Sequence, residues 1–158
     1  VSLEADGFKF TAIAEGNGLD GFIYVVDNTG ALGYTPAGAD YIATYSGVRI
    51  ELAAGGTFDF GGFTHYGHAR SEAMHVASYD ASGVQIGDTF DFVTSDTAWG
   101  GGTAFPGYDG DYFTFDDEVA NNGVAYVEII FDTNTNLDGN GLNLGSHANL
   151  LDDFVFEI

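Results

Sequence analysis

Hydrophobic residues in this chain recur at every second position, and this period constrains the fold more than any other feature. The clearest case is the segment 124–131 (VAYVEIIF), whose odd-numbered residues are all apolar. Side chains of a β-strand alternate between two faces, whereas a helix needs a period of 3.6 residues. No window of ten residues or more carries a helical stripe. The sequence therefore predicts an all-β protein with negligible helix.

Strand signals of this kind occur about ten times, in segments rich in Val, Ile, Tyr, Phe and Thr that end at Gly, Asn or Asp. The expected strands are residues 7–13, 22–26, 41–45, 48–53, 57–60, 73–79, 84–93, 112–115, 124–131 and 151–158. The segment DASG at 80–83 predicts a hairpin turn. Short strands at such spacing predict an antiparallel β-sandwich of jelly-roll type. Because no shift in composition marks a boundary, we expect one domain over 1–158, excised from a larger secreted protein.

The charge of the chain excludes several classes of partner. It has 24 acidic residues, three basic ones and a formal net charge of −21. Binding to nucleic acid or to an anionic membrane surface needs clusters of Lys and Arg, which are missing. No segment is apolar for long enough to predict a membrane-spanning helix. The chain has no cysteine, which excludes disulfides and thiolate zinc sites.

The acidic residues are scattered among 24 glycines, and two interpretations of them stay open. In the first, like charges keep an acidic surface soluble. In the second, the fold gathers carboxylates into sites that Ca²⁺ neutralises, since calcium takes six to eight oxygen ligands. Both can hold together, and calcium is the cofactor that we expect.

The strongest local calcium signal lies at 132–141 (DTNTNLDGNG), where oxygen-bearing side chains occupy every second position before a glycine turn. The candidate ligands are Asp132, Asn134, Asn136 and Asp138. Their spacing overlaps that of an EF-hand, but Gly145 stands where the closing Glu would be. The alternative is a turn stabilised by its own Asx hydrogen bonds.

A second candidate site joins the chain ends. Glu4 and Asp6 come before the first predicted strand, while Asp152 and Asp153 open the last one. The segments SLEADGF and LDDFVF resemble the terminal strands of calcium-dependent β-sandwich carbohydrate-binding modules, which implies a shared structural calcium. Alternation in the last strand also forces one of the two aspartates inward, where an uncompensated charge is costly. A loop with Asn17 and Asp20 is expected to complete one of the two sites.

The loop 94–112 combines aromatic and acidic residues, as a glycan-binding loop does, because sugar rings stack on aromatic faces. It contains the single tryptophan of the chain, beside three consecutive glycines. The alternative is a tryptophan that folds back to cap the core. The expected ligand-binding residues of this loop are Trp99, Asp96, Tyr108, Asp109 and Asp111.

A cluster at 61–71, expected to be a loop, contains His65, His68 and Arg70, and we expect these three residues to contribute to ligand binding. A zinc site is disfavoured because no HEXXH frame is present and His75 lies in a predicted strand. Arg70 is one of only two arginines. It is either a structural counter-ion or a clamp for an anionic group of the ligand.

The sequence gives little support for catalysis. It has no GxSxG motif, and carboxylate pairs are too abundant to indicate a glycosidase. The composition resembles that of domains in bacterial RTX adhesins, which are exported and fold in external calcium. That resemblance implies a secreted or cell-surface, monomeric, non-enzymatic domain that binds an extracellular glycan. The alternatives are a peptide-binding adhesin domain and a carbohydrate-binding module of a polysaccharide-degrading enzyme.

Overall fold

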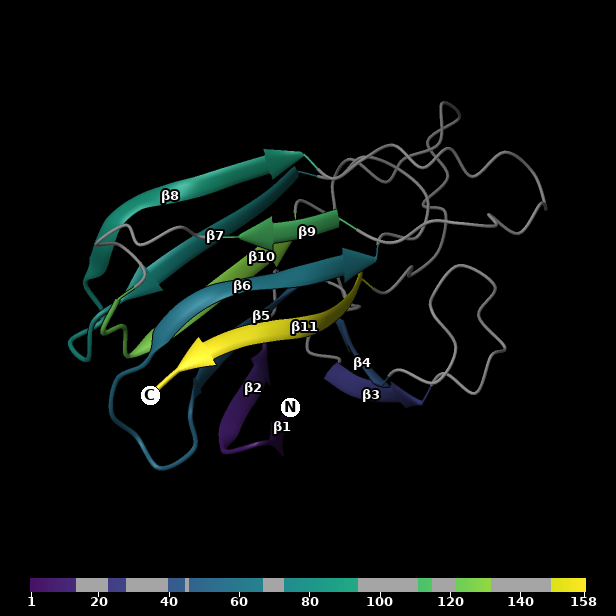
Figure 1. The fold of residues 1–158 in the computed structure, drawn as a ribbon, viewed down its shortest axis with the longest axis horizontal. Coiled ribbons are helices and arrows are strands. Elements are labelled where there is room, and N and C mark those ends of the chain that lie inside the picture. The colour runs from purple at the N-terminus through teal and green to yellow at the C-terminus, as the bar shows by residue number, and fades with distance from the viewer. Residues whose placement is uncertain are drawn as a thin grey trace.

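The computed structural model of the chain describes residues 1–13, 23–27, 40–44, 46–66, 73–93, 111–114, 122–131 and 149–158. These residues form eleven β-strands (Figure 1). The strands are β1 (Ser2–Ala5), β2 (Phe8–Ala12), β3 (Ile23–Asp27), β4 (Asp40–Thr44), β5 (Gly47–Leu52), β6 (Asp59–Tyr66), β7 (Ala73–Tyr79), β8 (Gln85–Val93), β9 (Asp111–Thr114), β10 (Tyr126–Phe131) and β11 (Asn149–Glu157). The described part of the chain contains no helix that is long and apolar enough to span a membrane.

The strands form two antiparallel sheets. Sheet A has the order β1-β2-β5-β10-β7-β8, and sheet B has the order β3-β4-β11-β6-β9. From β4 to β11 the chain pairs as one long hairpin rolled upon itself: β4 with β11, β5 with β10, β6 with β9, and β7 with β8. Rolling adds the contacts of β11 with β6 and of β10 with β7. This connectivity defines a jelly roll, so the predicted fold class is confirmed.

The core lies between the two sheets. It consists of the side chains that point inward at alternate positions of each strand. Val127, Ile129 and Phe131 of β10 are fully buried, as the two-residue period predicts. Opposite them, sheet B contributes Phe60 and Phe63 of β6, both buried and stacked 6.1 Å apart. Each of these side chains stabilises the fold by about 1.5–3 kcal/mol through burial.

The predicted turn between β7 and β8 is confirmed. The carbonyl of Asp80 accepts a hydrogen bond of 3.0 Å from the amide of Gly83. The carboxylate of Asp80 accepts the amides of Ser82 and Val84 at 2.8 and 2.9 Å. A short polar side chain followed by a glycine at φ 79° therefore closes this hairpin.

Two strands differ from the expectation. β1 is a further strand that pairs with β2, and β6 continues to Tyr66 through a segment expected to be a loop. In the structure Gly61 leaves room for the side chain of Val155 in β11, since a Cβ on Gly61 would lie 2.8 Å from Cγ1 of Val155. Gly61 therefore serves packing between neighbouring strands, which the local sequence does not reveal.

The outward face of sheet A carries two ion pairs between neighbouring strands. Lys9 donates to Glu51 at 2.8 Å, and Arg49 donates to Glu128 at 2.6 Å. Both pairs join residues that lie directly opposite each other in the ladders. They use both of the basic side chains in the described residues, on a chain that has only three.

Two tyrosines extend this network. The guanidinium of Arg49 lies 4.3 Å from the ring centre of Tyr126, whose ring stacks on Tyr79 at 4.7 Å. Burial raises the pKa of Tyr79, and the negative charge of Glu128 raises it further. Burial would lower the pKa of Arg49, but the hydrogen bond and charge of Glu128, together with Tyr126 and Glu51, raise it overall. This network of Arg49, Glu128, Tyr126 and Tyr79 therefore stabilises the pairing of β5, β10 and β7.

Candidate functional site

A cleft of about 660 Å³ opens between the β1–β2 hairpin of sheet A and strand β11 of sheet B. We call it the β2–β11 cleft. Its volume lies within the range of small-molecule and cofactor sites, about 300–1,000 Å³. It is lined by aromatic and aliphatic side chains together with three aspartates: Ala5, Asp6, Phe8, Phe10, Val25, Ile42, Leu151, Asp152, Asp153, Phe154, Phe156 and Ile158.

A β-bulge in β11 shapes one side of the cleft. The ladder with β6 passes from Asp152 opposite Thr64 to Val155 opposite Gly62, so β11 contains one extra residue. The extra residue is Asp153, with φ 49°. This extra residue shifts the alternation of inward and outward side chains by one position. Leu151 before the bulge and Phe154 after it therefore both face the core.

Phenylalanine rings from both sheets form the floor of the cleft. Phe8 of β2 stacks on Phe156 of β11 at 3.8 Å, and Phe10 packs against Phe154 at 5.5 Å. Phe154 and Phe156 are parallel within 5°. Phe8 and Phe10 are almost fully buried, whereas the two rings of β11 are only partly buried. The rings therefore both close the core and present an apolar surface to the cleft.

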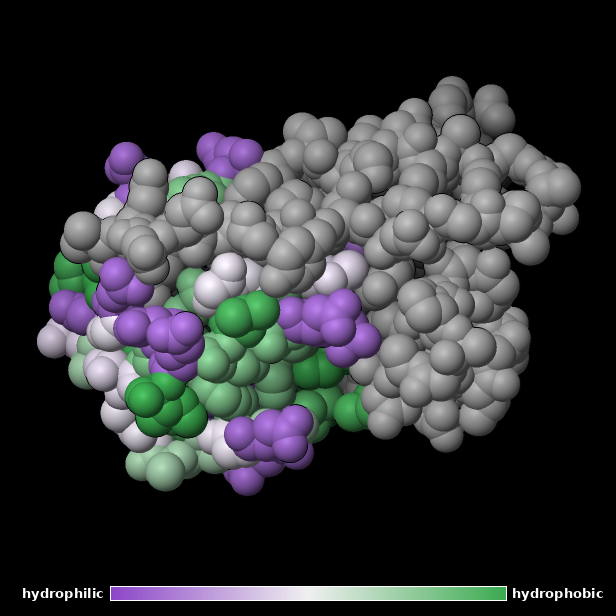
Figure 2. All heavy atoms as spheres, in the orientation of Figure 1, coloured by the Kyte–Doolittle hydropathy of each residue, from purple (hydrophilic) through white to green (hydrophobic). Residues whose placement is uncertain are grey.

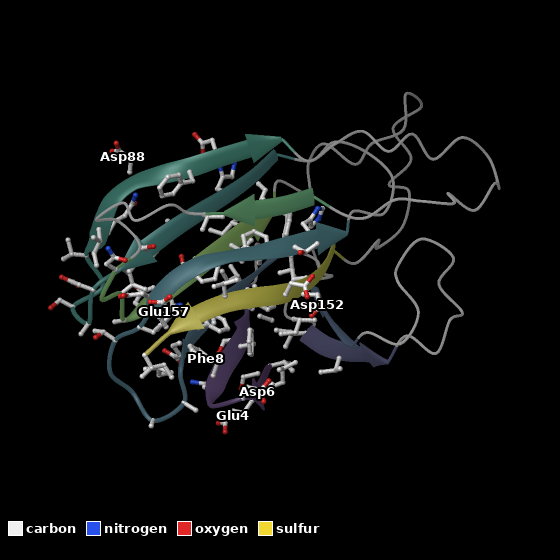
Figure 3. The ribbon with its side chains drawn as sticks, in the orientation of Figure 1. Glu4, Asp6, Phe8, Asp88, Asp152 and Glu157 are labelled. Carbon is white, nitrogen blue, oxygen red and sulfur yellow. The ribbon has the colours of Figure 1, made fainter. Side chains whose placement is uncertain are left out.

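Three of the four acidic residues predicted at the chain ends line this cleft. Asp6 lies in the β1–β2 turn with φ 51°, and Asp152 and Asp153 lie at the bulge. Figure 3 shows Asp6 and Phe8 on one side of β11 and Asp152 at the end of β11 near β3. Glu4 is not a lining residue. The fold therefore brings the first hairpin and the last strand to one cleft, but from opposite sheets, because β1 and β2 lie in sheet A and β11 in sheet B.

The expectation that one of Asp152 and Asp153 is forced inward is corrected. The bulge breaks the alternation, so Asp153 is exposed and Asp152 is only half-buried. Asp153 accepts a hydrogen bond of 3.1 Å from the hydroxyl of the buried Thr64. Within the described ranges, no three His, Cys, Asp or Glu side chains converge as they would around a metal.

Of the other predicted site residues, His65 and Asp111 belong to described strands and the remainder lie outside the described residues. His65 lies in β6, opposite Asp111 of β9. It is fully buried and stacks on Phe131 at 5.3 Å, so its expected place in a surface loop is wrong. Of Asp111 only the backbone is described. Outside the described residues lie Asn17, Asp20, Asp132, Asn134, Asn136, Asp138, Asp96, Trp99, Tyr108, Asp109, His68 and Arg70.

Sequence reasoning missed the aromatic floor of the cleft. Phe8 and Phe10, and likewise Phe154 and Phe156, alternate within strands, which indicated only a hydrophobic core. A sharper signal was available, because an aspartate stands just before an aromatic pair at both ends of the chain: Asp6 two residues before Phe8, and Asp153 one residue before Phe154. The two sheets bring these segments to one cleft from opposite sides.

Replacing Asp153 separates its backbone role from its charge. Asp153→Ala is expected to lose about 1 kcal/mol of stability in EDTA, because alanine tolerates a left-handed φ less well than aspartate and cannot accept from Thr64. Asp153→Asn keeps both properties and should stay within about 0.5 kcal/mol of wild type. Urea unfolding with and without calcium measures both variants.

If Asp153 also binds calcium, both variants lose part of the stabilisation that calcium provides. In calcium, Asp153→Ala should then destabilise the domain more than Asp138→Ala, because a site at the chain ends joins the whole fold. An equal or smaller loss than for Asp138→Ala would contradict a calcium site at the chain ends.

The fold and the cleft define the class of this chain as an all-β, two-sheet jelly roll with an open cleft at one seam. No protein-family model matches the chain, and no curated protein matches its sequence. A solved structure of a DUF4465 family protein from Bacteroides caccae is similar in fold, with a TM-score of 0.57 and 14% identity. That similarity covers 100% of this chain and 85% of the other.

A second solved structure, the enzymatically active domain of bacteriophage CBA120 tailspike protein 4, has a TM-score of 0.43 and 10% identity. It matches 96% of this chain but only 19% of the tailspike chain. At these identities the comparison with the DUF4465 protein supports the all-β sandwich-like fold alone.

Proposed function

We propose that this chain is a non-catalytic, calcium-stabilised ligand-binding domain of a secreted bacterial adhesin, monomeric and displayed outside the cell or on its surface. The observation that carries the proposal is the β2–β11 cleft, which joins an apolar aromatic floor to three aspartates. Concave, mostly apolar sites with a few polar groups are typical of ligand binding.

Binding is favoured over catalysis by the residues of the cleft. Its described lining consists of alanine, aspartate, phenylalanine, valine, isoleucine and leucine, without Ser, His or Lys. A Ser–His pair or a lysine nucleophile is therefore missing from the described lining. His75 makes its 2.6 Å contact with Asp91 across β7 and β8, not with the cleft.

Calcium is supported by charge and topology. The net charge is −21, and Asp6, Asp152 and Asp153 come from opposite ends of the chain to one cleft. Carboxylates on a chain of this net charge repel one another, and a bound cation lowers that repulsion. A domain that needs calcium would remain unfolded in a low-calcium cytosol and fold after export, which supports the secreted adhesin over the other parent proteins.

Ligand binding is tested with an array of glycans and a library of immobilised peptides, both probed with the calcium-loaded domain. Val25 lines the cleft and is 52% exposed, whereas Val84 is 61% exposed in the turn between β7 and β8. Val25→Arg should abolish binding to cleft ligands and Val84→Arg should not. Absence of any bound glycan or peptide would contradict the proposed function.

Glycan is the favoured ligand of the loop 94–112, and Trp99→Ala tests it. We expect this variant to lose about 2 kcal/mol or more of glycan-binding free energy, since an aromatic side chain often dominates a small interface. Its stability should fall by about 1 kcal/mol or less, because the neighbouring glycines offer the ring little packing. Thermal melts and array binding are measured on the same preparations. A stability loss of about 3 kcal/mol would instead identify Trp99 as a core residue.

A further inference from the structure

Among the described strands, none pairs with one edge of β11 over most of its length. On this edge β4 pairs only with Asn149, Leu150 and Leu151. Beyond them β11 pairs with β6 on its opposite edge, and no other described strand joins residues 153–158. The bulge at Asp153 marks the point at which β4 and β11 separate. Unpaired backbone N–H and C=O groups on such an edge form a template for another strand.

The cleft runs along this same edge and is apolar. Val25 and Ile158, which line it, are 52% and 92% exposed. Figure 2 shows a hydrophobic surface here, over β2 and the C-terminal part of β11, with hydrophilic groups on either side. Exposed aliphatic side chains beside a free strand edge match the needs of an added strand, which buries alternate side chains.

We propose that the β2–β11 cleft binds an extended peptide of about six residues, which adds to sheet B as a strand beside residues 153–158 of β11. The peptide alternates apolar side chains, which enter the cleft, with basic side chains, which face its acidic rim. Six residues in a strand span about 20 Å. This inference rests on the proposed ligand-binding function and names the ligand class of that site.

The basic character of the peptide follows from charge complementarity. The rim carries Asp6 and Asp153, and the exposed Glu157 ends the same strand edge. One Ca²⁺ bound by Asp6, Asp152 and Asp153 would neutralise two of their three negative charges, so the rim keeps negative charge together with Glu157. Lysine or arginine side chains would neutralise that remaining charge and steer the peptide to a chain with net charge −21. A second copy of the domain would bring the same acidic rim and the same net charge, which opposes edge-to-edge dimerisation.

The chemistry of the floor favours a peptide over a sugar in this cleft. Stacking of Phe156 on Phe8 at 3.8 Å already occupies a face of each ring. The exposed groups beside them are aliphatic, and a sugar cannot use the backbone edge as regularly as a strand does. Main-chain hydrogen bonds supply affinity in strand addition, while alternate side chains supply specificity.

The test uses a fluorescein-labelled peptide of alternating Lys and Val, seven residues long, acetylated and amidated at its ends. Anisotropy titration against the calcium-loaded domain should give saturable binding that weakens at high salt. Two further peptides carry N-methyl groups on all odd or on all even residues. One of the two should bind at least about tenfold more weakly, because only one set of amides can pair with β11. Equal affinities of both with the parent would overturn strand addition.

Protein variants locate the site. Val25→Arg should weaken peptide binding at least about tenfold, while Val84→Arg should leave it unchanged. Hydrogen exchange at the amides of residues 153–158 should slow on binding, with no change around Val84. Unchanged exchange at 153–158 would overturn the proposal, as would dimerisation of the free domain through this edge.

These experiments distinguish failure of the strand-addition proposal from failure of the proposed ligand-binding function. If glycans bind and Val25→Arg removes them, while the Lys–Val peptide does not bind, ligand binding in the cleft stands and the strand proposal is wrong. If Val25→Arg affects no bound glycan or peptide, the cleft is not the binding site, and both inferences about it fail.

Discussion

Removal of calcium is expected to lower the melting temperature of this domain by about 10 °C. A ligand present at 1,000 times its dissociation constant contributes about 4 kcal/mol to stability. For a domain of this size, 1 kcal/mol corresponds to about 2–4 °C. The physical reason is the repulsion among the acidic residues of a chain with net charge −21, of which Asp6, Asp152 and Asp153 share one cleft. Differential scanning calorimetry in EDTA and in millimolar calcium measures the shift.

Controls assign the calcium effect to a place in the fold. Magnesium and sodium chloride should give much smaller shifts than calcium. Asp6→Asn should reduce the calcium-dependent shift, whereas Asp88→Asn should not, because Asp88 is exposed on β8 and does not line the cleft (Figure 3). Coincident melts with and without calcium would contradict calcium stabilisation. A full shift in Asp6→Asn would move the site to another part of the chain.

Gly47→Ala is expected to lower the free energy of unfolding by about 3 kcal/mol, more than the glycine substitution used as its control. Gly47 begins β5 at φ 155°, and a Cβ there would lie 2.5 Å from the carbonyl oxygen of Ile129 and 3.1 Å from Cα of Ile130. Both atoms belong to the backbone of β10, in the middle of sheet A, so they cannot rotate away. Overpacking of this kind typically costs about 1–3 kcal/mol, and the unfavourable φ adds to it.

Gly55→Ala is the matched control, because Gly55 has φ 76° and no atom within 4 Å of the added Cβ. It should lose only the backbone preference of glycine, about 1–2 kcal/mol. Urea unfolding of both variants gives the two free energies. A loss for Gly47→Ala no greater than that for Gly55→Ala would show that β5 can move away from β10.

Local sequence was sufficient to predict the fold class, because each strand carries its own signal. The alternation in 124–131 predicts which side chains of β10 are buried, and Asp80 followed by Gly83 predicts the β7–β8 turn. That the first hairpin and the last strand line one cleft was also predictable from the acidic residues at the chain ends, although β1 and β2 lie in sheet A and β11 in sheet B and the terminal strands do not pair. In these cases the residues that form a feature are close in sequence or are joined by the fold class itself.

Only the tertiary structure decided the features that depend on contacts between distant strands. The bulge at Asp153 exists because β11 must fit β6, and it moves both aspartates away from the core. Strand β6 runs through Gly61, where the side chain of Val155 packs closely. His65 is buried because β6 continues beyond Gly61 to that position. The edge of β11 that no described strand covers arises from the length over which β4 remains paired, and no local pattern sets that length. Strand pairing is non-local, so a sequence determines which residues can form strands, whereas packing between sheets determines where those strands bend, end and leave a cleft.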